Sequence, residues 1–481
     1  MRKKKDTSYG LNDQILSPLE TLAQSIANIA PTATPTVVIP LVFAMSGNGT
    51  WLAYVFALVG ILLVAANINQ FSRHSASPGS LYTYIAAGLN PLFGVLAGWA
   101  LLIAYIGTAS AVTSGFTNYA NVLLQPLTKF GDVPPVPLAW LLTALVVGVA
   151  WLVAYKDIQL SARLMLAPEL LSVSLIALLV VLTLIKNGWH VDWQQFSLKG
   201  VTPNALRLGL VLAIFSFVGF ESATALGTEA RHPLRTIPRA VVLSAVLVGA
   251  LFIVSSYGLV LGFAGYHETL DQSAAPLNVL AIRAGVGLLA PLVSLGAVVS
   301  FFACVLACIN AGARILFLMG RHGLFHTAVG DAHADNKTPH VAVSIAAVFT
   351  FVPAAILILF HVKPFDIYGW IGTVATYGFI ITYMLISVAA PVYLYRRGQL
   401  TIKSIVIALG AIAFMAIALA GNLYPVPPAP YNWLPYLFLV YLGTGILWYY
   451  ILRISAPQVV LNIQHDLREI QERFAGDGAG I

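Results

Sequence analysis

Charged residues are scarce in this chain of 481 residues: they make up 9% of it, against roughly 25% in a typical soluble domain. Apolar residues make up 59%. No soluble core could bury that much apolar surface, so the composition excludes a soluble protein and predicts one embedded in a lipid bilayer. The net charge of +7 comes from basic residues scattered among short loops, which argues against a nucleic-acid-binding patch.

Cysteine and the common catalytic motifs are also scarce or missing. Cys304 and Cys308 are the only two cysteines, one helical turn apart in an apolar segment, so we expect ordinary packing and no disulfide framework. The chain contains no HExxH, GxSxG or Walker A motif, and its histidines lack metal-ligand spacing. We therefore expect no enzyme, no ATP-driven pump, no cofactor and no metal.

Long apolar runs are what the chain has in abundance. If both termini lie on the same side of the membrane, most of the 25 lysine and arginine residues lie on that side too. Because basic residues are enriched in cytoplasmic loops, this distribution predicts a protein of the cell membrane with both termini in the cytoplasm. Twelve runs are long enough to cross a bilayer, at residues 19–44, 51–71, 92–124, 136–155, 161–185, 205–228, 239–264, 288–319, 339–360, 367–395, 402–421 and 433–454.

Two of these runs contain residues that break a membrane helix. The sixth run includes Gly219 and Glu221, and a carboxylate at bilayer depth costs about 2.5–3.5 kcal/mol on insertion scales. The first run includes Pro31 and Pro35, each of which removes a backbone donor. Breaks at matching places in two halves indicate an inverted-repeat transporter with a binding site at the midplane. The alternative is two unrelated kinks, which are common in membrane helices.

Three segments resemble the amino acid–polyamine–organocation (APC) permeases. The sixth run and its following loop read FSFVGFESATALGTEARHPLRTIPRAV, similar to that family's pattern, although His232 stands where asparagine is usual. PGSLYTY at residues 78–84 is similar to the loop after the second span. NAGARILFLMGRHGLF at residues 310–325 is similar to the end of the eighth span.

The resemblance implies an all-α integral membrane fold of the leucine-transporter type, with twelve transmembrane helices in a 5+5 inverted repeat. Spans 1 and 6 would be broken. The implied divisions are an N-terminal cytoplasmic tail at residues 1–14, a first repeat at 15–186, a second repeat at 203–397, two further spans at 402–455, and a cytoplasmic amphipathic tail at 456–481.

The resemblance also implies where a substrate binds. A substrate carboxylate would meet amides of the first break, while an amino group would meet carbonyls of both breaks, in keeping with the dipoles of half-helices. Glu221 would anchor the broken helix or contact the amine, and Phe215 would take the place of an aromatic gate or simply pack. The residues concerned are Ala27, Asn28, Ile29, Thr32, Ala33, Thr34, Phe215, Ser216, Val218 and Glu221.

Two departures from the family pattern bear on mechanism. The first break reads APTATP rather than a glycine-rich sequence, so recognition of a carboxylate would rely more on the hydroxyls of Thr32 and Thr34. Glu169 appears where several relatives have a lysine, and a carboxyl group buried from water is suited to carry a proton. The alternative is that Glu169 lies near the cytoplasmic end and pairs with a basic residue such as Arg163.

The sequence thus predicts a secondary transporter for amino acids or closely related amines, working by alternating access with proton coupling or exchange. Polyamine or ethanolamine transport and sodium coupling, the latter through a hydroxyl such as that of Ser300, stay open as alternatives. The expected partners are a small-molecule substrate, protons and the bilayer, and no nucleic acid; the sequence leaves the oligomeric state open. The five arginines of the cytoplasmic loops, which we expect to set topology and form inner-gate ion pairs with Glu229, are Arg231, Arg235, Arg239, Arg314 and Arg321.

Overall fold

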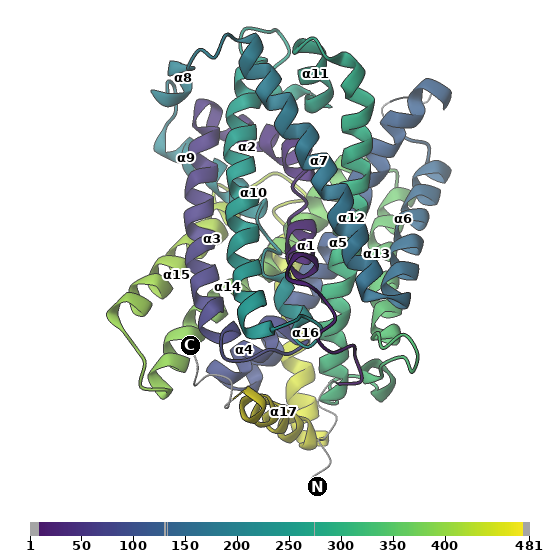
Figure 1. Ribbon diagram of the computed structural model, residues 1–481, viewed down its shortest axis with the longest axis vertical. Coiled ribbons are helices and arrows are strands. Elements are labelled where there is room, and N and C mark those ends of the chain that lie inside the picture. Colours follow the sequence, from purple (N-terminus) through teal and green to yellow (C-terminus); the bar gives the residue numbers. More distant parts are fainter. Residues whose placement is uncertain (1–8, 129–130, 132, 274, 475–481) are drawn as a thin grey trace.

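The protein is a bundle of long helices in the computed structural model, which describes residues 9–128, 131, 133–273 and 275–474 (Figure 1). Across these residues the only β-type pairing is one isolated bridge between Leu16 and Ala230. Ten stretches of the described chain are long and apolar enough to cross a membrane. The prediction of an all-helical membrane protein is confirmed. Residues 1–8 and 475–481 of the two predicted tails lie outside the described residues.

The first half of the chain begins with short helical pieces and continues with long ones. Asp157 separates α6 from α7 and caps α7 by accepting a hydrogen bond from the Gln159 amide. The helices are α1 (Pro18–Ile29), the π-helical turn η1 (Thr34–Val38), α2 (Ile39–Ser46), α3 (Thr50–Ser72), α4 (Ser80–Gly88), α5 (Pro91–Thr128), α6 (Val136–Lys156), α7 (Ile158–Lys186) and α8 (Trp193–Phe196).

The second half follows a similar course. Proline occupies the first turn of many of its helices, where its missing N–H would have had no helical partner. The helices are α9 (Pro203–Phe215), the 3₁₀ turn η3 (Ser222–Leu226), α10 (Pro233–Phe263), α11 (Pro276–Arg283), α12 (Ala290–Arg321), α13 (His340–Leu359), α14 (Pro364–Arg396), α15 (Ile402–Leu423), α16 (Leu434–Ser455) and α17 (Gln458–Phe474).

The difference between twelve predicted runs and ten candidate spans arises at the two interrupted runs. The first and second predicted runs together form one continuous candidate stretch, Pro18–Ser72. The sixth run is divided between α9, which has only 13 residues, and η3. A helix of 13 residues rises only about 20 Å, too short to cross a bilayer by itself.

Helix α5 forms the centre of the bundle, because it packs against both α12 and α14. Small residues allow this close approach. A Cβ atom added to Gly378 of α14 would lie 2.4 Å from the carbonyl oxygen of Ala100 on α5. Such backbone proximity holds α5 and α14 together, and each of them contributes a buried tyrosine, Tyr105 or Tyr383, to the interior of the bundle.

The C-terminal helix α17 lies across the lower end of the bundle in Figure 1, where it follows α16. It buries Val459, Ile463 and Ile470, which lie on one helical face. The predicted amphipathic helix is therefore present in residues 458–474, and its apolar face packs against the protein.

Candidate substrate-binding site

The first interruption lies between α1 and η1. α1 ends at Ile29, and Ala30 adopts a left-handed conformation with φ of 53°. Pro31 lies in the interruption and cannot donate a backbone hydrogen bond, whereas Pro35 lies in the first turn of η1, where its missing N–H would have had no helical partner. Helical structure resumes with η1 at Thr34. The break predicted over residues 28–35 is thus present in the structure.

The second interruption follows α9. This helix ends at Phe215, and the chain then passes through turns before η3 begins at Ser222. Gly219 has a φ of +87°, a conformation that residues with a side chain rarely adopt. The glycine therefore permits the sharp change of direction within the sixth predicted run.

The two interruptions meet in the interior of the protein. Ser222 Oγ donates a hydrogen bond to the carbonyl oxygen of Gln24 at 3.1 Å, and the Ala223 amide donates to Ser25 Oγ at 3.0 Å. One turn further along α1, the side chain of Asn28 covers Gly219: a Cβ added to the glycine would lie 1.7 Å from Asn28 Nδ2. Two segments about 200 residues apart in sequence thus form one buried polar centre.

Glu221 is fully buried at this centre and is held by two tyrosines. Tyr105 of α5 donates a hydrogen bond to Oε1, and Tyr383 of α14 donates to Oε2, both at 2.5 Å. The Tyr383 hydroxyl also accepts a hydrogen bond from the Gly219 amide at 3.1 Å. These contacts compensate the carboxyl group for lost hydration and join the break to two neighbouring helices.

The other predicted substrate residues of the first break are all buried. Ala27, Ile29, Ala33 and Thr34 are each at most 5% exposed. Thr32 is 1% exposed, and its hydroxyl group has no hydrogen-bond partner in the described part of the chain. A buried hydroxyl without a partner is uncommon in folded proteins and is available to a ligand.

The predicted residues of the second break contact α3, α5 and α14. The hydroxyl groups of Ser216 and Tyr54 of α3 lie 3.1 Å apart. Phe215 is half-buried, and its ring lies close to Gly372 of α14, where an added Cβ would lie 3.2 Å from the ring. Val218 is 5% exposed.

Glu169 lies on α7, where it is 2% exposed and faces α12. Ser300 Oγ donates a hydrogen bond to Glu169 Oε1 at 2.7 Å, while Oε2 has no partner among the described residues. Arg163, the alternative partner suggested by the sequence, is 71% exposed and pairs with Glu20 at 3.4 Å instead. The suggestion that Glu169 pairs with Arg163 is therefore wrong, because the two side chains point into different surroundings.

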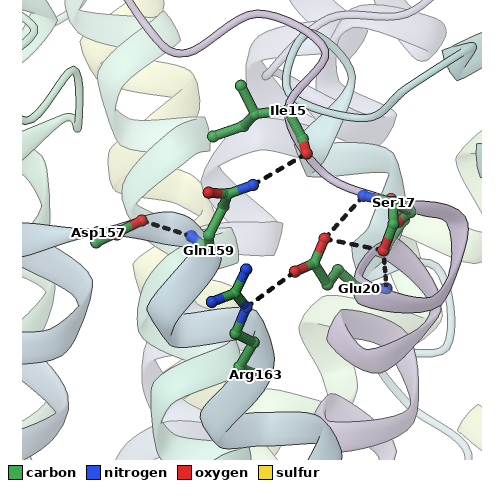
Figure 2. A network of polar contacts seen from close by, with 7 residues as sticks. Ile15, Ser17, Glu20, Asp157, Gln159 and Arg163 are labelled. Atoms are coloured by element: carbon green, nitrogen blue, oxygen red, sulfur yellow. Dashed lines mark hydrogen bonds and ion pairs between the residues drawn. The ribbon is translucent and has the colours of Figure 1, made fainter.

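The segment that leads into α1 and the first turn of α1 are fastened to the start of α7 (Figure 2). Ser17 and Glu20 form a capping box, in which each side chain bonds the other's backbone amide. Glu20 also meets Arg163, and Gln159 Nε2 donates to the Ile15 carbonyl at 3.1 Å (Figure 2). The segment before α1 is thus tied to α7 by contacts that include the exposed side chain of Arg163.

Of the five arginines expected to pair with Glu229, the structure brings Arg314 to it. Their atoms approach to 2.6 Å, and both side chains are almost completely buried. Arg321 instead donates to the carbonyl oxygen of Tyr9 at 3.4 Å. The ion pair therefore joins α12 to the segment between η3 and α10, with a single arginine as partner.

Tyr105 and Tyr383 reach Glu221, and Glu169 reaches Ser300, only through the folding of distant helices. No local motif marks the two tyrosines; their one sequence signal is a polar aromatic group within an apolar run. Among the described residues, no cluster of three or more histidine, cysteine, aspartate or glutamate side chains could hold a metal ion.

Known proteins similar to this chain are membrane permeases. A family model described as "Amino acid permease" matches residues 20–458. The low-affinity putrescine importer PlaP of Escherichia coli K12 is 28% identical over 328 residues, covering 64% of this chain and 69% of the relative. The branched-chain amino acid permease BcaP of Lactococcus lactis is 25% identical over 401 residues, covering 80% and 83%.

A mouse protein is also similar to this chain. Cationic amino acid transporter 4 of Mus musculus is 24% identical over 355 residues, covering 71% of this chain and 54% of the relative. The family and these relatives are transporters and not enzymes, in agreement with the prediction from the missing catalytic motifs. Because the family model spans nearly all of the described chain, this protein belongs to the amino acid permease family of the APC group.

Proposed function

We propose that this protein is a secondary active transporter that moves amino acids, or closely related amines, across the cell membrane by alternating access. The observation that carries the proposal is the meeting of two interrupted helices, one ending at Ile29 and the other at Phe215, at a buried centre. Main-chain groups at such breaks lack helical partners and can bind the charged ends of a zwitterion.

The helix ends at the breaks suit both charged groups of a zwitterion. The C-terminal end of α1 is the negative end of its dipole, and its carbonyls near Asn28 suit an ammonium group. The helix that begins at η1 offers the positive end of a dipole near Thr32 and Thr34, which suits a carboxylate. Glu221 serves in this scheme as the anchor of the second break, because both its oxygens accept tyrosine hydrogen bonds.

The proposed architecture has twelve spans, with residues 15–186 and 203–397 as inverted repeats and residues 402–455 as two peripheral spans. Both termini are cytoplasmic in this proposal. The positions of the breaks support it, since α1 and α9 are each interrupted and each opens one of the proposed repeats. On this arrangement the Glu20–Arg163 and Glu229–Arg314 pairs lie on the cytoplasmic side.

We assign proton coupling to Glu169. Its carboxyl group is buried, one oxygen has only Ser300 as a partner, and the other has none in the described chain. A group in this setting can be neutral in one conformation and charged in another when water reaches it, which is what coupling to a proton gradient needs. Sodium held by Glu169 and Ser300 is the alternative that the same oxygen atoms would support.

Uptake by purified protein in proteoliposomes tests the proposal. The panel contains labelled L-leucine, L-arginine, putrescine and ethanolamine, each with and without an inward proton gradient and with and without sodium. We expect saturable uptake of an amino acid that a proton gradient increases and sodium does not. Uptake of putrescine or ethanolamine alone would favour the amine alternative, and dependence on sodium would favour the other ion. No transport of any panel member would contradict the proposed function.

A further inference from the structure

The two cysteines of α12 lie against the end of α1. Cys308 Sγ donates a hydrogen bond to the side-chain oxygen of Asn28 at 3.0 Å. Cys304 Sγ contacts the main-chain oxygen of the same residue at 3.5 Å, and the two sulfur atoms are 4.0 Å apart. Both thiols are buried. One asparagine at the first break thus receives contacts from both cysteines in the chain.

The thiol determines which way the Asn28 carboxamide points. The Cys308 thiol donates to the side-chain oxygen of Asn28, so this oxygen faces α12. The amide nitrogen then faces the second break, where it lies over Gly219. This NH₂ group is buried and has no hydrogen-bond partner in the described part of the chain. A buried donor without a partner costs about 1–3 kcal/mol, which a ligand can recover.

A second such group lies four residues further along. The Thr32 hydroxyl is buried and also lacks a partner among the described residues. Pro31, which lies between Asn28 and Thr32 in the sequence, contributes no backbone donor. The first break therefore presents two side-chain donors in a segment where proline has reduced the number of main-chain donors.

We propose that Cys308 is a positioning residue for substrate recognition: its thiol holds the Asn28 carboxamide so that the NH₂ group donates to the carboxylate of the substrate. This inference rests on the proposed transport function and narrows the substrate to molecules that carry a carboxylate. Thr32 supplies a second donor to the same group. Side chains thus replace main-chain amides that proline has removed.

The acidic groups of the site agree with this choice of substrate. A diamine has no carboxylate for Asn28 and Thr32, and it needs an acidic partner at each end. Both oxygens of Glu221 already accept hydrogen bonds from Tyr105 and Tyr383, so an amine at this carboxyl group would have to share it with two tyrosine hydroxyls. The centre suits one ammonium group and one carboxylate better than two ammonium groups.

The competing explanation is that Cys308 only fills space, and kinetics of matched variants separate the two. Cys308→Ala removes the hydrogen bond, Cys308→Ser restores a hydroxyl donor of similar size, and Cys304→Ala is the control on the neighbouring turn. Each variant is assayed in proteoliposomes with L-leucine and isopentylamine, and with L-arginine and agmatine, so that each amino acid is compared with its decarboxylated form.

For Cys308→Ala we expect KM for the transported amino acid to rise about 5–10-fold with little change in kcat, the effect of one lost hydrogen bond. Cys308→Ser is expected to restore KM to within about twofold of the wild type, as a hydroxyl donates at least as well as a thiol. Cys304→Ala is expected to change KM less than Cys308→Ala. Any uptake or competition by the decarboxylated amine stays unchanged in Cys308→Ala.

Asn28→Asp provides an independent measurement if Cys308→Ala fails to reach the membrane. It keeps the side-chain shape, removes the NH₂ donor and adds a negative charge, so it should abolish amino acid uptake and increase competition by the amine. The inference is overturned if Cys308→Ala leaves KM unchanged, if Cys308→Ser behaves like Cys308→Ala, or if wild-type protein transports the amines but not the amino acids. A wild type that transports none of these probes contradicts the proposed function itself.

Discussion

Arg314 and Glu229 form a bidentate ion pair, in which Nε and Nη2 of the arginine lie 2.6 and 2.8 Å from the two carboxylate oxygens. Neither side chain is more than 1% exposed. Arg314 also donates to the carbonyl oxygen of Asn310 at 2.9 Å, so its position is fixed within its own helix. The pair holds α12 to the segment that leads into α10.

We predict that Arg314→Met destabilises the protein by about 3–5 kcal/mol, because it leaves the charge of Glu229 buried without its partner. The double variant Arg314→Met/Glu229→Leu should lose less, since it removes both charges. Thermal melting in detergent measures the difference, with the exposed Arg396→Met as the control. A double variant that is no more stable than Arg314→Met would contradict the assignment of the loss to an unpaired charge.

Gly219 is the position where a single methyl group should be most damaging. A Cβ there meets Asn28 Nδ2 at 1.7 Å, and the φ of +87° is unfavourable for alanine. We expect Gly219→Ala to abolish uptake while much of the protein still inserts. Gly148→Ala is the matched control, because an added Cβ there meets nothing within 4 Å. If Gly219→Ala transports at the wild-type rate, the geometry of the second break is incorrect.

The hydroxyl group of Tyr383 joins Glu221 to the Gly219 amide. Tyr383→Phe removes both contacts and should cost about 1.5–3 kcal/mol of stability, the range for hydrogen bonds to charged groups. Uptake should fall as well, because the second break loses its connection to α14. Tyr395→Phe, at a position 72% exposed, should behave as the wild type in melting and uptake. Equal melting temperatures for the two variants would remove the anchoring role of Glu221.

The Glu169→Gln variant tests proton coupling. Glutamine keeps the hydrogen bond with Ser300 but cannot bind and release a proton, so accumulation driven by a pH gradient should be lost. Exchange of internal for external substrate should persist, because it needs no net proton movement. Counterflow and gradient-driven uptake are measured in the same vesicles, with Ser300→Ala as the companion variant. Full gradient-driven accumulation by Glu169→Gln would remove this residue from the coupling step.

The sequence was informative about the two breaks because their causes are local. Pro31 and Pro35 remove backbone donors wherever they stand, and Gly219 beside a carboxylate is unsuited to a lipid-facing helix. These local effects predicted the interruptions that the structure contains. The number of apolar runs did not predict the number of candidate spans in the structure. Two of the twelve runs form the single stretch Pro18–Ser72, and one run is divided at Phe215.

The partners of the site residues could not be predicted in the same way. Tyr105 and Tyr383 lie 116 and 162 residues from Glu221, and Cys308 lies 280 residues from Asn28. Such contacts depend on how α5, α12 and α14 pack together, and the sequence pattern along one helix carries no record of that packing. For the same reason the pairing of Arg163 with Glu20 rather than Glu169 emerged only from the fold.

The central claim is that a small zwitterion binds between the two interrupted helices. An experimentally determined map of the protein in lipid nanodiscs, with and without the amino acid transported in the uptake panel, tests it most directly. We predict substrate density beside the two breaks, with the carboxylate near the side-chain NH₂ group of Asn28 and the Thr32 hydroxyl, and the ammonium group near the main-chain carbonyls at the end of α1. Substrate density at another place, or unbroken helices through residues 28–35 and 215–222, would contradict the account.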